Sequence, residues 1–180
     1  MNITRKQTQC TRCNVGVIFI TGGPGTGKST VAALLHEKMG CPWYEFGWIP
    51  EFRQKNPHTI LSWEEEEALS LENLLLVTDN YLRHGFDHVI LTDIREPYTD
   101  TVYAHYGPDR LRLVTLVADN DALIRHRVLS RDNGNAYRNA EEAAALNIKF
   151  RSRTVLPGEL RLPCDSMTAE EIADIIIKNL

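Results

Sequence analysis

Short apolar runs alternate along the chain with longer segments in which apolar positions recur at the helical spacing. The runs are rich in Val, Ile and Leu and predict buried strands at 15–21, 44–46, 88–93, 111–117 and 159–162. The segments between them predict helices at 28–39, 63–83, 98–106, 122–130, 140–150 and 169–179. Strands that are apolar on both faces and separated by helices favour a mostly parallel sheet. We therefore expect an α/β fold with three layers, in which helices cover both faces of a five-stranded, mostly parallel sheet.

Polar residues mark the ends of several of these helices. Ser62 with Glu65, and Thr168 with Glu171, each fit the capping box at a helix start. Asp119 or Asp121 is expected to cap the helix at 122–130. The acidic run at 64–67 fits a solvated first turn, where the helix dipole favours negative charge, better than a metal cluster.

Length and charge limit the possible functions. The chain has 180 residues, which suggests a 1–14 N-terminal arm followed by one domain over 15–180. The formal net charge is −4, which makes a nucleic-acid partner unlikely. No apolar run is long enough to span a membrane, and no secretory signal precedes residue 15, so we expect a cytoplasmic protein. The C-x-x-C pair in the arm lacks the second pair of a zinc site.

A glycine-rich segment between the first strand and the first helix fits G-x-x-x-x-G-K-[ST]. Its glycines allow backbone N–H groups to point at phosphate oxygens, and the following helix directs its positive end at the same anion. Lys28 is expected to reach the β- and γ-phosphates, and the Ser29 hydroxyl is expected to ligate Mg²⁺. The predicted segment that binds a nucleoside triphosphate consists of Gly22, Gly23, Pro24, Gly25, Thr26, Gly27, Lys28, Ser29 and Thr30.

Polar residues follow the second and third predicted strands. The carboxyl ends of parallel strands share one rim, so Glu45, Asp93 and Arg95 should lie near the glycine-rich segment. Asp93 is a candidate metal ligand or a candidate base for an attacking hydroxyl. A helix cap or an ion pair with Arg95 is the alternative interpretation of Asp93. The planar fork of Arg95 suits an acceptor carboxylate or phosphate.

Five aromatic residues crowd the segment 43–52, at the rim where such sheets bind ligands. One interpretation is a wall of the acceptor site, with Glu45, Trp48 and Arg53 contacting the substrate. The other is that these aromatic side chains simply pack in the core.

Arginines flank a candidate lid at about 131–153. Phosphoryl transfer needs positive charge around the migrating group, and Arg131 and Arg138 are the candidate catalytic arginines. Arg151 or Arg153 could reach the same place from the far side of the lid.

These features in this order resemble the small P-loop kinases, such as nucleotide, nucleoside, shikimate and gluconate kinases and chloramphenicol phosphotransferase-like proteins. The resemblance rests on the glycine-rich segment, Asp93 with Arg95, the segment 127–131 and the loop 162–167, and it covers about 15–180. It implies that Arg127 lies against the adenine, that Arg131 faces the phosphates, and that Pro163 begins a loop that closes over the base. The sequence Asp-Ile-Arg-Glu-Pro from Asp93 departs from the D-G-x-P-R of adenylate-type kinases.

The expected activity is an ATP- and Mg²⁺-dependent transfer of the γ-phosphoryl group to a small-molecule hydroxyl or phosphate, by a monomer or homodimer. The acceptor is not evident from the sequence. The alternative is a nucleotide-binding regulator or partner-coupled NTPase without a small-molecule acceptor. A polynucleotide 5′-hydroxyl kinase is disfavoured by the acidic balance, and an AAA-type motor by the length.

Overall fold

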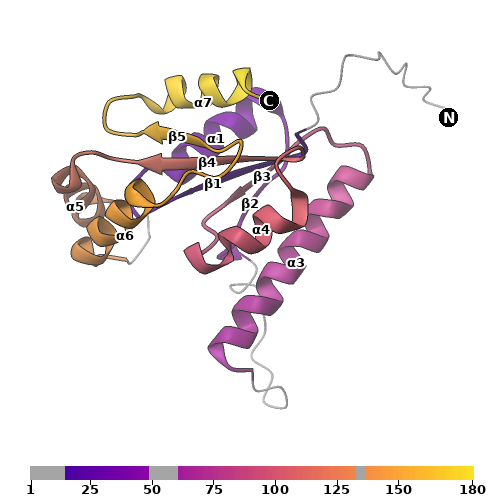
Figure 1. Ribbon diagram of the computed structural model, residues 1–180, viewed down its shortest axis with the longest axis horizontal. Helices are drawn as coiled ribbons and strands as arrows, with labels where there is room; N and C mark the ends of the chain where they lie inside the picture. Colours follow the sequence, from indigo (N-terminus) through magenta and orange to yellow (C-terminus); the bar gives the residue numbers. More distant parts are fainter. Residues whose placement is uncertain (1–14, 49–60, 133–136) are drawn as a thin grey trace.

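A five-stranded parallel sheet forms the centre of the protein (Figure 1), seen in a computed structural model that describes residues 15–48, 61–132 and 137–180. The strands lie in the order β2-β3-β1-β4-β5, and every neighbouring pair is parallel. Their bounds are β1 Val17–Gly22, β2 Trp43–Glu45, β3 Val89–Thr92, β4 Leu111–Val117 and β5 Leu160–Pro163. The predicted three-layer α/β fold is confirmed.

Helices cover both faces of this sheet (Figure 1). In chain order they are α1 Lys28–Met39, α3 Trp63–Arg83, the short 3₁₀ helix η1 Glu96–Tyr98, α4 Thr99–Tyr106, α5 Asp121–Ser130, α6 Ala140–Ser152 and α7 Ala169–Lys178. Successive side chains of β1 point to opposite faces of the sheet, so they belong to two separate hydrophobic cores. Ile18 and Ile20 pack with α1 and α7, whereas Val17 and Phe19 pack with α3 and α4.

The ends of the predicted strands and helices all lie within two residues of the observed ends, but one predicted helix cap is wrong. Both capping boxes form, at Ser62 and at Thr168. The cap of α5 is neither Asp119 nor Asp121 but Asn120, whose side chain accepts hydrogen bonds from the main-chain N–H groups of Ala122 and Leu123. None of the described helices is long and apolar enough to cross a membrane.

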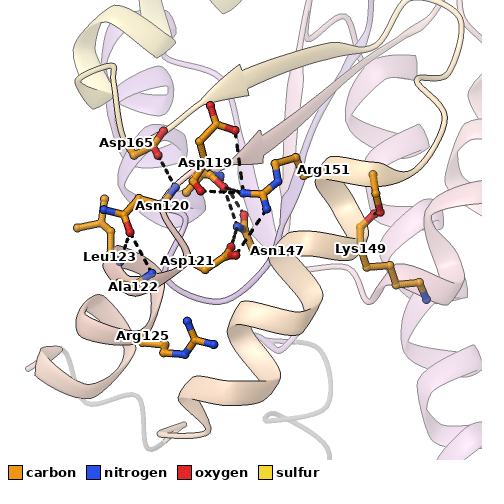
Figure 2. A network of polar contacts seen from close by, with 12 residues as sticks. Asp119, Asn120, Asp121, Ala122, Leu123, Arg125, Asn147, Lys149, Arg151 and Asp165 are labelled. Carbon is orange, nitrogen blue, oxygen red and sulfur yellow. Dashed lines mark hydrogen bonds and ion pairs between the residues drawn. The ribbon is translucent and has the colours of Figure 1, made fainter.

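Helix α6 is fastened to the carboxyl end of β4 (Figure 2). The Asn147 side chain is buried; its Oδ1 accepts from the Ala118 N–H at 2.9 Å, and its Nδ2 donates to the Ala118 carbonyl at 2.8 Å. Arg151 donates to the carbonyls of Ala118 and Asp119. Arg151 thus lies within α6 and binds main chain at the end of β4. It is therefore not directed at a transferring phosphate, contrary to the expectation from the sequence.

Arg153 also takes part in the fold. Its guanidinium makes two 2.8 Å contacts with the carboxylate of Glu159, whose side chain is inaccessible to solvent. The same carboxylate accepts hydrogen bonds from the Thr115 hydroxyl at 2.6 Å and the Leu156 N–H at 2.8 Å. This network holds the segment after α6 against β4, which explains why Arg153 is not directed at the phosphate site either.

Replacing Asn147 should destabilise the protein. Asn147→Ala leaves the buried N–H and C=O of Ala118 without the amide that pairs them, and we expect a loss of about 2 kcal/mol in the free energy of unfolding. Urea unfolding measures this loss. Ser152→Ala, an exposed change at the end of the same helix, is the control and should stay within about 0.5 kcal/mol. An equal effect of the two changes would contradict the anchoring role of Asn147.

Glu159 should make stability depend on pH. Burial alone would raise the pKa of this carboxyl, but the hydrogen bonds from Arg153, Thr115 and Leu156 outweigh burial and lower it. A carboxyl with a lowered folded-state pKa stabilises the fold above its unfolded pKa, and this stability is lost as the pH falls through the folded pKa.

Glu159→Gln should therefore cost about 3 kcal/mol near pH 7, and progressively less below about pH 4. Urea midpoints measured from pH 7 down to pH 3 test this. Glu37→Gln, an exposed change on α1, supplies the control. A cost that is the same at every pH would show that the charge of Glu159 contributes nothing.

Candidate active site

The glycine-rich loop connects β1 to α1 and has the backbone conformation that its glycines predict. Gly22 has φ of 140°, and a Cβ there would collide with the Leu116 carbonyl oxygen of β4. Gly23 lies against α6, because an added Cβ would be 3.3 Å from both the Ala143 carbonyl oxygen and the Asn147 nitrogen. The Thr26 hydroxyl closes the loop by donating to the Gly23 carbonyl at 2.8 Å. The fastened helix α6 therefore supports the loop directly.

Lys28 begins α1 and places its ammonium group inside the loop. Nζ donates to the Gly23 carbonyl at 3.3 Å and lies 3.6 Å from Oδ1 of Asp93. Burial lowers the pKa of Lys28, and the nearby carboxylate of Asp93 opposes this effect. A buried ammonium group with one distant carboxylate is incompletely compensated, so an arriving phosphate would stabilise its charge.

Asp93 directly follows β3 and has a backbone conformation that is rare for side-chain-bearing residues. Its φ of 61° is the only positive φ of a non-glycine among the described residues. Its ion pair is with Lys28 and not with Arg95, which corrects the alternative interpretation of Asp93. Unusual backbone conformations of this kind concentrate at functional sites.

Glu45 ends β2 and contacts Ser29, the predicted magnesium ligand. The Ser29 hydroxyl donates to Oε1 of Glu45 at 2.6 Å. Asp93 supplies a second carboxylate on the other side of Lys28. A hydroxyl and carboxylates are hard oxygen donors of the kind that Mg²⁺ takes together with substrate phosphates. Residues 15–48, 61–132 and 137–180 contain no cluster of three His, Cys, Asp or Glu that would hold a metal without a phosphate.

A cavity of about 730 Å³ opens over the glycine-rich loop. Its floor is the segment 24–31, and one side is closed by Arg127 and Arg131 from the end of α5. The remaining lining residues are Glu45, Asp93, Tyr137, Cys164, Met167, Thr168, Ala169 and Ile172. The volume is sufficient for a nucleotide, since small-molecule sites span about 300–1,000 Å³.

Arg127 lies on the side where the resemblance implies the base. Its Nη2 donates to the Cys164 carbonyl at 3.2 Å, and both residues line the cavity. Pro163 does not line the cavity, because it is the last residue of β5 and pairs with Val117. The turn that closes this side therefore begins at Cys164, one residue later than predicted.

Arg131 and Arg138 lie next to each other at the foot of the candidate lid. Nη2 of Arg138 donates to the Arg131 carbonyl at 3.0 Å, and Arg131 lines the cavity. Burial, followed by the charge of Arg138, lowers the pKa of Arg131. Arg138 itself lines neither cavity, so of the two predicted catalytic arginines Arg131 is the one placed to meet an anion in the first cavity.

A second cavity of about 490 Å³ adjoins the first. The two share four lining residues: Pro24, Lys28, Asp93 and Tyr137. The first cavity is large enough for a nucleotide, and the second meets it at Lys28 and Asp93. This is the arrangement that transfer between two ligands requires.

The residues predicted for the acceptor side are not all in the second cavity. Arg95 lines it, whereas Glu45 lines only the first cavity. Trp48 lines neither, and its ring lies 5.3 Å from that of Trp43. Arg53 lies outside the described residues. Of these two aromatic residues of the segment, Phe46 lines the second cavity and Trp48 does not, so the predicted wall of the acceptor site would involve Phe46.

Sequence reasoning missed several lining residues of the second cavity. Tyr137 follows the lid tip and carries no motif, yet it borders both cavities. Burial, followed by a hydrogen bond to Glu142, raises the pKa of Tyr137 to about 12, so its hydroxyl stays a donor. Glu67 belongs to the acidic run that the sequence assigned to a solvated helix start, but its carboxylate binds Arg95. Glu67 lies after the first turn of α3, and this position could have distinguished it from the acidic residues at the helix start.

Comparison with known proteins agrees with this geometry. The family described as "AAA domain" matches residues 18–147. Among curated protein sequences, none matches this chain. An unliganded sugar kinase from Janibacter sp. HTCC2649 is 16% identical, with a TM-score of 0.63 over 91% of this chain and 93% of that one.

Two further solved structures have similar folds. A gluconokinase from Sinorhizobium meliloti 1021 is 15% identical, with a TM-score of 0.61 over 93% of this chain and 92% of that one. The Mycobacterium tuberculosis APS kinase in complex with AMPPNP and APS is 19% identical, with a TM-score of 0.59 over 92% of this chain and 96% of that one. At such identities the likeness concerns the fold alone. The chain belongs to the AAA-domain family and has the fold of the small P-loop kinases.

Proposed function

We propose that the protein is an ATP-dependent phosphotransferase that moves the γ-phosphoryl group to a small-molecule acceptor. The observation that carries this proposal is the meeting of two cavities at Lys28 and Asp93. A regulator or an NTPase without a small-molecule acceptor requires only the first cavity. The kinases among the similar structures add support at the level of the reaction class.

On the donor side, the loop amides and Lys28 bind the phosphates of ATP. Arg127 and the turn from Cys164 hold the base, since both line this cavity and a hydrogen bond joins them. Arg131 and Arg138 balance the charge that develops on the migrating group.

In the proposed step, an acceptor oxygen forms a bond to the γ-phosphorus. The bond from this phosphorus to the bridging oxygen breaks, and ADP leaves with the electron pair. Asp93 takes the proton of an attacking hydroxyl, because it is the carboxylate that borders both cavities and is near Lys28. Lys28 stays beside the phosphates throughout and offsets their charge.

Ser29 and Glu45 are the proposed protein contacts of Mg²⁺ with the bound phosphates. Their oxygens lie 2.6 Å apart in the donor cavity, and both are hard donors. Mg²⁺ bound there would neutralise part of the phosphate charge. Glu45, which we expected on the acceptor side from the sequence, is therefore proposed to act on the donor side.

Lys28→Ala should abolish phosphoryl transfer while the protein stays folded. The change removes the cation that faces both cavities, and kcat should fall by at least about a thousandfold. ADP release in the presence of an acceptor library measures it. Lys178→Ala, an exposed change at the end of α7, is the control and should retain wild-type turnover. Full turnover in Lys28→Ala with any acceptor would overturn the assignment.

Glu45 and Asp93 should have separable effects. Glu45→Gln should raise the Mg²⁺ concentration needed for half-maximal ATP binding about tenfold, because it weakens the oxygen beside Ser29. Asp93→Asn should leave ATP binding largely intact but lower kcat, because an amide does not accept the hydroxyl proton.

The matched readouts are a Mg²⁺ titration of ATP binding and single-turnover transfer. Asn suits position 93 because it tolerates the positive φ better than other uncharged residues. If Asp93→Asn transferred phosphate at the wild-type rate, the base would have to be another group.

A further inference from the structure

The second cavity has an apolar wall on each side. Phe46, Ile94 and Pro97 come from the segments that follow β2 and β3, and Leu146 and Phe150 come from α6. Phe46, Ile94 and Phe150 are buried, so these groups have fixed positions. Apolar side chains from two different parts of the chain thus line one cavity, and such a lining favours a ligand with a flat or methylene-rich face.

The charged groups of the same cavity are mostly acidic. Four carboxylates line it, those of Glu67, Asp93, Glu96 and Glu142, against the two cations Lys28 and Arg95. This balance refers to the described residues. Glu96 is itself paired with Lys149 at 3.0 Å, which leaves one carboxylate in excess over the cations. An anionic ligand would therefore still meet net negative charge, and charge interactions are stronger at a partly buried site than in water.

Neither cation of the cavity is available to neutralise an acceptor. Lys28 faces Asp93 and is committed to the donor phosphates. Nη1 of Arg95 lies 2.5 Å from Oε1 of Glu67, and its Cζ lies 4.6 Å from the centre of the Trp63 ring. An acceptor carboxylate or phosphate at Arg95 would have to approach or displace the carboxylate of Glu67, which repels it.

The carboxylates, in contrast, offer acceptor oxygens for hydroxyl or ammonium groups. Glu142 lies beside Tyr137, whose hydroxyl is 3.0 Å from Oε2, at the border of the two cavities. Glu67 has a side chain only 17% exposed; its Oε1 accepts from Arg95 and its Oε2 from the Tyr98 hydroxyl at 3.4 Å, so a ligand group would share these oxygens with Arg95 and Tyr98. Charge-assisted hydrogen bonds to such carboxylates are about twice as strong as neutral ones.

We propose that the acceptor is an uncharged or positively charged alcohol with an apolar face, and not a carboxylate, phosphate or sulfate. This inference rests on the proposed phosphotransferase function and names its acceptor class. The apolar face packs between Phe46 and Phe150, and hydroxyl or ammonium groups bind Glu67 and Glu142. One hydroxyl is left to face Asp93 and the γ-phosphorus, and it loses its proton to Asp93 as its oxygen bonds to phosphorus.

Acceptors that share a carbon skeleton and differ in one terminal group, which is a carboxylate, a hydroxyl or an ammonium group, test the proposal. One set carries a ring and a benzylic hydroxyl: mandelate, 1-phenylethane-1,2-diol and 2-amino-1-phenylethanol. The other has the same sugar chain throughout: gluconate, glucitol and glucamine. ADP release above the rate without acceptor is measured for each. Within a set that stimulates release, the neutral or ammonium member should exceed the carboxylate in kcat/KM by at least about tenfold.

The outcomes separate the two proposals. Equal or better stimulation by a carboxylate member overturns the acceptor class and leaves the phosphotransferase standing. If ATP binds and is hydrolysed in a Lys28-dependent way but no member of either set stimulates release, the acceptor class as stated is contradicted. The phosphotransferase assignment falls only if no member of the wider acceptor library stimulates ADP release either. The alternative of an NTPase without a small-molecule acceptor is then favoured.

A charge-neutralising variant gives an independent readout on the same sets. Glu67→Gln frees Arg95 and removes one negative charge, so the preference for neutral over anionic members should shrink by about tenfold. Glu72→Gln makes the same change on the exposed side of α3 and should leave the preference unaltered. If Glu67→Gln does not fold, Glu142→Gln serves instead, with the same expectation. An unchanged preference in the folded variant would contradict the role of the carboxylates.

Discussion

The site depends on one buried ammonium group, that of Lys28. Burial of this ammonium group disfavours its charge. Its polar neighbours include the Gly23 carbonyl and the carboxylate of Asp93 at 3.6 Å. Neither compensates fully for the lost hydration. A polyphosphate would do so, together with the main-chain N–H groups that loops of this type offer to phosphates. The loop glycines are needed because an added Cβ would meet β4 at Gly22 and α6 at Gly23.

The parallel sheet turns this binding site into a candidate transfer site. Parallel register brings Glu45 at the end of β2 and Asp93 after β3 to the side of the loop, so that one carboxylate reaches Ser29 and the other reaches Lys28. Helix α6 adds the opposite wall, and its position follows from Asn147 and Arg151, which bind the main chain at the end of β4 (Figure 2). The arginines nearest the lid therefore divide into two groups. Arg151 and Arg153 hold the fold, whereas Arg127 and Arg131 face the donor cavity.

Charge pairing distinguishes the two cavities. The proposed donor cavity is lined by Arg127 and Arg131, whose positive charge favours an anion. On the acceptor side, Arg95 is already paired with Glu67 and stacked on Trp63, and further carboxylates surround it. A single arginine in a sequence suggests an anion site, but its partners in space decide whether it attracts an anion or is neutralised by its neighbours.

The sequence by itself determined the elements and the donor side of this protein. Both depend on local patterns in the sequence, namely apolar runs, capping residues, and a loop in which the glycines and Lys28 lie close together in the chain. The parallel α/β architecture follows because buried strands alternating with helices have few other ways to pack. Only the tertiary structure decided the acceptor side. Phe46, Glu67, Tyr137 and Phe150 come from four separate segments, and none belongs to a motif. They line the same cavity because β2, α3 and α6 approach one another beside Lys28. A local sequence pattern cannot predict contacts between residues so far apart in the chain.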